Sequence, residues 1–172
     1  MKKLLLLFFL TFSFNFGHSQ FFVEGQAGGV NFIGVSIGSG YRINLDKNNK
    51  HHLTPQVGFG TMLPIWHELR ALVNLGVDYQ YKGWGAGIAL SKFDNRYGYP
   101  DDGFIQADFV DVIIYPNISY TFSPKSSTHW YCKVTSGAYL AFSHNNTTQN
   151  PIAMEFQGDA LPGAGFGLGY RF

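Results

Sequence analysis

The clearest indication of the fold is the last stretch of the chain, Ala164-Gly165-Phe166-Gly167-Leu168-Gly169-Tyr170-Arg171-Phe172. Every second residue of this stretch is apolar, and three glycines and Arg171 lie between the apolar residues. Successive side chains of a strand point to opposite faces, so strict alternation predicts a β-strand with two unlike faces. One face is bulky, and the other has almost no side chain before Arg171. A strand that turns its bulky face to lipid and its small face to a crowded lumen has this pattern.

No segment after the N-terminus has a helical period. Seven earlier stretches alternate in the same way: 21–28, 32–45, 53–63, 69–81, 84–91, 109–122 and 129–142. Short connections follow the first four and the sixth, whereas long segments, 94–108 and 143–161, follow the fifth and seventh. Outer-membrane barrels have an even strand number, short turns at one end and longer loops at the other. The sequence therefore predicts an all-β fold, a closed antiparallel eight-stranded up-and-down transmembrane β-barrel.

Two local features refine this prediction. The pair Gly28-Gly29 is expected to make a tight connection between the first two strands. Pro116 lies inside the sixth stretch, where a proline removes a ladder hydrogen bond. Since a closed barrel has no edge strand to accommodate it, we expect a β-bulge there. The adjacent His51 and His52 are expected to be a solvated pair in a turn.

Aromatic residues of the bulky face gather at the strand ends nearest the short turns. Amphipathic aromatic side chains prefer the boundary between lipid and water, so these residues predict a girdle on the periplasmic side. The girdle is expected to contain Phe21, Tyr41, Tyr79, Tyr81, Trp84, Tyr120, Phe122, Trp130, Tyr170 and Phe172. A sparser outer ring is expected from Phe32, Trp66, Phe109 and Phe142.

The opposite face of the strands carries the charged residues. The lumen of an eight-stranded barrel is just wide enough for side chains to fill it. Lone desolvated charges are costly, so we expect opposite charges to pair in an ion network that plugs the lumen. Its predicted members are Glu24, Arg42, Arg70, Asp78, Asp111, Lys133 and Arg171. A proton or ion path along the same residues is the functional alternative.

The N-terminus and the composition indicate an exported protein. Lysines at positions 2 and 3, a short apolar run, and small residues before Gln20 predict a cleaved signal peptide over residues 1–19 and a barrel domain over 20–172. Charged residues make up only 13% of the chain and aromatic residues 17%. A formal net charge of +1 gives no electrostatic footprint for nucleic acid. The single cysteine, Cys132, rules out an internal disulfide.

Two features carry a resemblance to known proteins. The terminal phenylalanine with apolar residues at alternate positions before it resembles the C-terminal insertion signal of outer-membrane β-barrels. In strand number and turn pattern, residues 20–172 resemble the small eight-stranded outer-membrane barrel proteins of Gram-negative bacteria. The resemblance implies an integral outer-membrane location with both termini in the periplasm. It also implies assembly by the barrel-insertion machinery through the C-terminal strand, and contact with outer-membrane lipids and lipopolysaccharide.

A barrel of this kind does not specify a reaction. The leading hypothesis is a non-enzymatic protein with no cofactor or metal, whose external loops bind an outside partner or an envelope component. One alternative is an outer-leaflet lipid-modifying enzyme, because His144, Asn146 and Glu155 faintly resemble the lipid A deacylase pattern. That family has a serine where this chain has Asn146, which cannot act as the nucleophile. The second alternative is a soluble, exported lipocalin-like barrel that binds a ligand.

Overall fold

A computed structural model describes residues 19–62, 70–94, 112–124, 129–142 and 161–172, and eight strands lie within them. The strands are β1 (Ser19–Gly28), β2 (Gly34–Asn44), β3 (His51–Met62), β4 (Arg70–Tyr81), β5 (Trp84–Phe93), β6 (Val112–Phe122), β7 (Trp130–Phe142) and β8 (Leu161–Arg171). A short 3-10 helix, η2 (Gly29–Asn31), joins β1 to β2. The strand limits differ from the predicted ones by a few residues, most at β8, which begins before Ala164.

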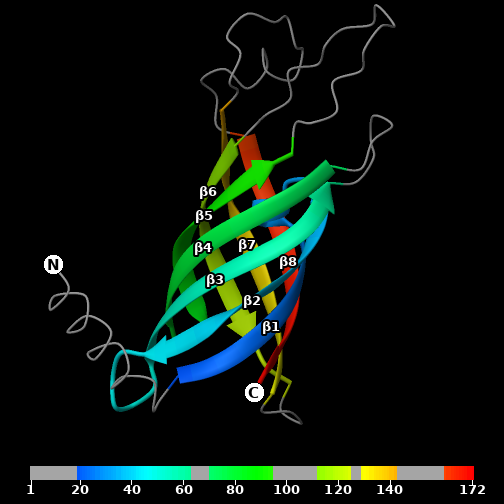
Figure 1. Ribbon diagram of the computed structural model, residues 1–172. Coiled ribbons are helices and arrows are strands. Elements are labelled where there is room, and N and C mark those ends of the chain that lie inside the picture. Colours follow the sequence, from blue (N-terminus) through cyan, green and yellow to red (C-terminus); the bar gives the residue numbers. More distant parts are fainter. Residues whose placement is uncertain (1–18, 63–69, 95–111, 125–128, 143–160) are drawn as a thin grey trace, which may run out of the picture.

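The eight strands form a closed barrel in which each strand pairs antiparallel with the next along the chain. The first and last strands close the ring through register pairs from Phe22–Arg171 to Gly28–Gly165. The backbone N–H of Phe172 extends this seam by donating to the carbonyl of Phe21 at 2.9 Å. The start of β1 and the C-terminus lie at the same end as the short turns (Figure 1). The predicted closed, eight-stranded up-and-down barrel is confirmed.

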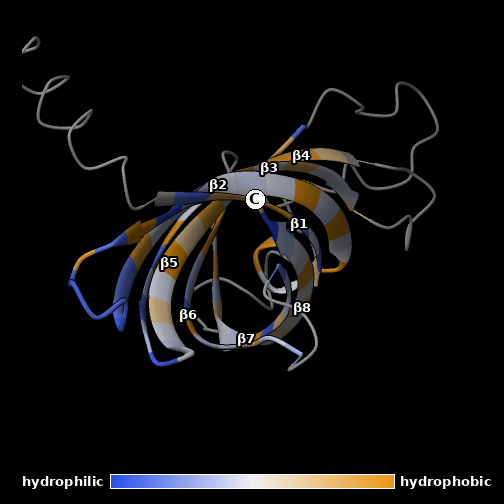
Figure 2. Cartoon of the chain, turned by 90° about the horizontal axis from the view of Figure 1, so that it is seen from below, coloured by the Kyte–Doolittle hydropathy of each residue, from blue (hydrophilic) through white to orange (hydrophobic). Residues whose placement is uncertain are grey.

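The two faces of each strand differ as the alternation predicts. In β4 the odd-numbered residues from Ala71 to Tyr81 are exposed on the outside, whereas Leu72, Asn74 and Asp78 are buried inside. Figure 2 views the barrel from the short-turn end, and hydrophobic residues alternate with more hydrophilic ones along its ribbons. The outer wall is thus largely apolar, and the polar side chains of the strands turn inward.

Two tight connections at the short-turn end depend on local backbone chemistry. Lys82 and Gly83 both have positive φ, 49° and 90°, and this conformation suits the two-residue turn between β4 and β5. Between β2 and β3, the carboxylate of Asp46 accepts backbone N–H bonds from His51 and Lys50 at 2.8 Å and from Asn48 at 3.3 Å. The bond from His51 contributes most to holding the pKa of Asp46 below its usual value.

The connection between β1 and β2 is not the tight turn predicted from Gly28-Gly29. It folds into the lumen as η2, whose three residues are all buried and which contacts every strand of the barrel. Hydrogen bonds hold it there: Asn74 Nδ2 donates to Asn31 Oδ1 at 2.9 Å, and Ser91 Oγ donates to the carbonyl of Val30. Gly28 and Gly29 have positive φ, 65° and 56°, which glycine adopts without strain. The pair therefore allows the chain to enter the lumen rather than to make a tight turn.

A small apolar layer surrounds η2 inside the barrel. Its buried members are Val30, Met62, Leu72, Ala89, Phe93, Ile113, Tyr115 and Tyr139. Phe32 packs against this layer, with its ring 5.1 Å from that of Tyr139 in an edge-to-face arrangement. Phe32 therefore does not belong to an outer aromatic ring, and that part of the prediction is wrong. Of the other predicted ring members, Phe142 is exposed, and Trp66 and Phe109 lie outside the described residues.

Pro116 does not introduce a bulge, so that prediction is wrong. The pairs Ile114–Leu140 and Asn117–Gly137 share one register between β6 and β7, with no extra residue between them. The missing N–H interrupts the pairing with β7 only at Tyr115 and Pro116, while the register with β5 is continuous. Pro55 interrupts the pairing between β3 and β2 in the same way. A proline can therefore be accommodated by a short gap in one ladder.

Large inward side chains lie over glycines of the neighbouring strand. A Cβ atom at Gly167 would lie 2.6 Å from Glu24 Oε1, and one at Gly58 would lie 3.0 Å from Asn74 Cγ. Further pairs of this kind are Gly40 with Phe22, Gly87 with Asp78, Gly163 with Tyr139, and Gly169 with Tyr131. The inward glycines thus provide the room that the large polar and aromatic side chains occupy.

The inward fold of η2 makes Gly29 a sensitive position. A Cβ atom at Gly29 would lie 2.9 Å from Thr135 Oγ1, and a β-branched residue there would be strained at φ 56°. We expect Gly29→Val to lower the free energy of unfolding by about 1–3 kcal/mol, measured by urea titration of the folded barrel. Gly25→Val is the matched control, because Gly25 faces outward with its nearest neighbour at 3.9 Å. Equal stability of the two variants would contradict this placement of η2.

Candidate functional site

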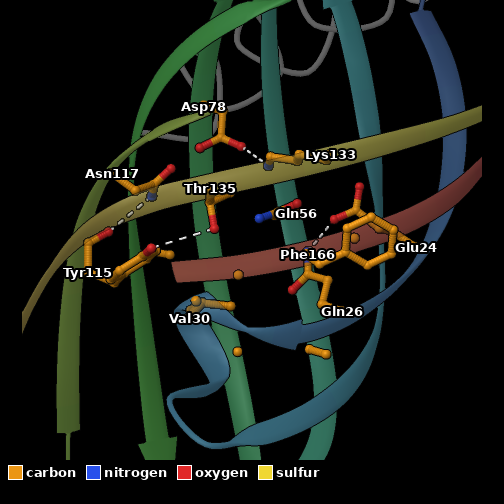
Figure 3. A pocket seen from close by; sticks show the side chains of 16 residues that line it. Glu24, Gln26, Val30, Gln56, Asp78, Tyr115, Asn117, Lys133, Thr135 and Phe166 are labelled. Atoms are coloured by element: carbon orange, nitrogen blue, oxygen red, sulfur yellow. Dashed lines mark hydrogen bonds and ion pairs between the residues drawn. The ribbon is translucent and has the colours of Figure 1, made fainter. Parts of the chain in front are cut away.

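The described part of the lumen is centred on an ion pair between Lys133 of β7 and Asp78 of β4. These strands are not neighbours in the barrel, so the pair spans the lumen. The side chains of Lys133 and Asp78 are 6% and 2% exposed, respectively. At this burial an unpaired charge would be strongly destabilising, so each group depends on the other. Figure 3 shows the two side chains meeting at one side of the cavity that they line.

Glu24 is the second buried acid of the lumen and is 2% exposed. Gln26 lies two residues further along β1 on the same face, and its Nε2 donates to Glu24 Oε1 at 2.6 Å (Figure 3). Glu24 lines the same cavity as Lys133, but Lys133 forms its ion pair with Asp78. The carboxylate of Glu24 is therefore stabilised by a neutral amide donor and by nearby positive charge.

The cavity beside these residues is small. Its volume is about 30 Å³, and η2 closes one side with Gly29 and Val30. The hydroxyl of Tyr115 is part of its polar wall and donates to the carbonyl of Gly163 at 3.2 Å. This volume holds one or two water molecules and no drug-sized ligand, since such pockets measure about 300–1,000 Å³.

A second cavity, of about 10 Å³, lies toward the short-turn end. Glu24, Gln56 and Lys133 line both cavities and therefore separate them. The second cavity also contacts Arg42 of β2 and Arg171 of β8. The guanidinium of Arg171 lies over the ring of Tyr131, 4.3 Å from its centroid, in a cation–π contact.

The predicted lumen residues are only partly brought together. Glu24, Arg42, Asp78, Lys133 and Arg171 all line the two cavities, but Lys133–Asp78 is the ion pair formed among the described residues. Arg70 lies at the start of β4, at the opposite end of the barrel from the short turns, and its side chain is not described. Asp111 lies outside the described residues. We expected all opposite charges to pair, but Arg42 and Arg171 form no ion pair with a described carboxylate.

The predicted girdle residues lie on the outside of the barrel, near the short turns. Neighbouring rings contact one another: Trp84 and Tyr120 at 5.0 Å, Trp130 and Tyr170 at 5.2 Å, and Tyr170 and Phe172 at 5.0 Å. Phe21, Tyr41, Tyr79, Tyr81 and Phe122 are also exposed. These residues come from strands spread around the barrel, so they form a belt rather than a patch.

Sequence reasoning missed two histidines of this belt. His51 faces outward, where its ring lies 4.7 Å from that of Tyr81 and its Nδ1 is 2.5 Å from the hydroxyl of Tyr79. His129 stacks on Tyr170 with ring centroids 5.3 Å apart. His52 faces inward and is buried, with its Nδ1 2.7 Å from Asn44 Oδ1. The expectation of a solvated histidine pair is therefore wrong, and extending the strand alternation by two residues would have separated the two side chains.

The residues behind the enzymatic alternative, His144, Asn146 and Glu155, lie outside the described residues. Within the described ranges there is no cluster of three or more histidine, cysteine, aspartate or glutamate side chains suited to a metal ion. No helix in these ranges has the length and apolarity needed to cross a membrane. Comparison of the chain with protein-family models, curated proteins and solved structures gives no match.

The buried ion pair gives a double-mutant test. Asp78→Leu or Lys133→Met alone leaves one buried charge without its partner, so each should lower the free energy of unfolding by about 3–5 kcal/mol. The double variant removes both charges and should recover most of that loss. Urea unfolding of the four proteins measures the coupling. Additive losses in the double variant would show that the two side chains do not depend on each other.

Proposed function

We propose that the protein is an integral β-barrel of the Gram-negative outer membrane and is not an enzyme. The observation that carries this proposal is the distribution of polarity across the wall. Apolar side chains midway along the strands are exposed to the outside, among them Ile37 at 69%, Phe59 at 64% and Leu75 at 55%, while an ion pair is buried inside. Water would favour the opposite arrangement, and lipid favours this one.

The aromatic belt supports an orientation. Its tyrosine and tryptophan rings have an apolar body and a polar tip, which suits the boundary between hydrocarbon and water. The belt lies at the end that holds the short turns, the start of β1 and the C-terminus, and in outer-membrane barrels this end faces the periplasm. The same orientation directs the ends of β5 and β7, and hence the two long connections, to the cell exterior.

The cavities argue against the soluble, ligand-carrying alternative. A lipocalin-like carrier needs an apolar cavity large enough for its ligand. Here the lumen is filled by polar side chains, the layer around η2 and cavities of about 30 and 10 Å³. The apolar surface that could bind another molecule is on the outside and extends around the barrel. Lipid acyl chains are the partner that fits such a surface.

The proposed role is that of a membrane scaffold for external loops. The long segments 94–108 and 143–161 would bind an outside partner or an envelope component, in contact with outer-membrane lipid and lipopolysaccharide. The C-terminal strand would be the segment recognised by the barrel-insertion machinery. Its terminal Phe172 is exposed on the outer wall, with its ring 5.6 Å from that of Phe21.

Location and folded state can be tested in one preparation. We expect the protein in outer-membrane fractions of its bacterial host, and we expect unheated samples to migrate differently from boiled samples in SDS gels because the closed barrel resists the detergent. Recovery of the folded protein in the soluble periplasmic fraction would contradict the proposal.

A substitution midway along β4 tests the lipid face directly. Leu75→Arg places a charge on the outer wall, and in lipid vesicles it should lower the free energy of unfolding by about 2–4 kcal/mol. Leu45→Arg is a closely matched control, since Leu45 is 54% exposed and Leu75 55%, but Leu45 lies in the β2–β3 turn. The control should change stability by no more than about 0.5 kcal/mol. A harmless Leu75→Arg would indicate that this wall faces water.

A further inference from the structure

Arg42 and Arg171 stand out in the lumen because two guanidinium groups share a cavity whose wall holds a single described carboxylate, that of Glu24. They come from β2 and β8, the strands on either side of β1, and both are half-buried against the 10 Å³ cavity. Among the described residues, no carboxylate forms an ion pair with either guanidinium. Partly desolvated guanidinium groups that form no ion pair are costly, and one carboxylate cannot offset two of them, so a further negative group is expected to balance the charge.

The remaining charges of the cavity do not balance the arginines. Lys133 adds a third positive group to its wall but is paired with Asp78, which does not line this cavity. Glu24 is the acid in the described wall, and Gln26 donates to its carboxylate. Its negative charge also acts favourably on Arg171, so it offsets one of the two arginines and leaves the other uncompensated. The two arginines line the same cavity, so their like charges oppose each other. The wall therefore carries a net positive charge.

Two polar atoms in the wall are unused. The Nε of Arg42 and the hydroxyl of Thr54 are both buried and have no hydrogen-bond partner among the described residues. Both residues line the 10 Å³ cavity. Arg171 is better supported, because its guanidinium lies over Tyr131 and its Nη1 is 3.5 Å from Ser123 Oγ. Unused donors beside an uncompensated positive charge are the groups that bind an anion.

We propose that the short-turn mouth of the barrel binds a small oxyanion, a phosphate or carboxylate group, between Arg42 and Arg171. The planar guanidinium groups present paired donors that match the oxygen atoms of such an anion. The enclosed space admits about one oxygen-sized atom, so one oxygen enters toward Thr54 and the rest of the anion remains at the mouth. In the orientation proposed above, the ligand comes from the periplasm.

The test is a calorimetric titration of the folded, detergent-solubilised protein with inorganic phosphate and, separately, with acetate at constant ionic strength. We expect saturable binding of at least one of them. Arg42→Gln and Arg171→Gln should each weaken it by about tenfold or more, since each removes a charge-assisted contact. Saturation by phosphate alone indicates a phosphate group as the natural ligand, and saturation by acetate alone indicates a carboxylate.

Lys92→Gln is the matched control, because Lys92 is exposed on the outside of β5 and its loss changes the net charge equally. It should leave the affinity unchanged. Thr54→Val keeps the side-chain shape and should weaken binding by about fivefold, so it tests the site even where an arginine variant fails to fold. Absence of saturable binding to the wild-type protein, or equal weakening by Lys92→Gln, would overturn the proposal.

Discussion

The narrow interior of an eight-stranded barrel is the constraint on which the rest of this structure depends. Side chains from opposite walls meet in the middle, so a large residue can point inward only where a neighbouring strand leaves room for it. The glycines of β8 illustrate this, since Gly167 lies beside Glu24 and Gly169 beside Tyr131. The same constraint brings Asp78 and Lys133 together from non-adjacent strands and leaves water-sized cavities beside them. A lumen filled in this way supports the wall from inside.

Much of this architecture could be predicted because strand alternation is a property of consecutive residues. In β4 and β8, the sequence alone separates the outward residues from the inward ones, and the number of alternating stretches predicts the strand number. The belt of aromatic residues follows from the same reasoning once the short connections are assigned to one end.

The parts that could not be predicted depend on contacts across the lumen. Nothing near Val30 in the sequence indicates that the β1–β2 connection turns inward, because its partners, Asn74 and Ser91, are far along the chain. Leu72 is an apolar residue on the polar face of β4, and it has a place there because η2 brings an apolar layer inside the barrel. Alternation places Arg42, Asp78 and Lys133 in the lumen but does not determine which charges meet. Pro116 shows that the energetic cost of a missing N–H does not require an extra residue in the strand, because a gap in one ladder suffices.

The seam between β1 and β8 has a consequence for how the protein is made. The first strand has one edge without a partner until the last strand arrives, and the seam extends to the hydrogen bond from Phe172 to Phe21. The cylinder therefore cannot close before β8 has been synthesised. Pairing segments from opposite ends of the sequence gives a high contact order and slow folding, and it leaves strand edges open to aggregation meanwhile. Until β8 pairs with it, the open edge of β1 is a template to which a strand of another chain can add.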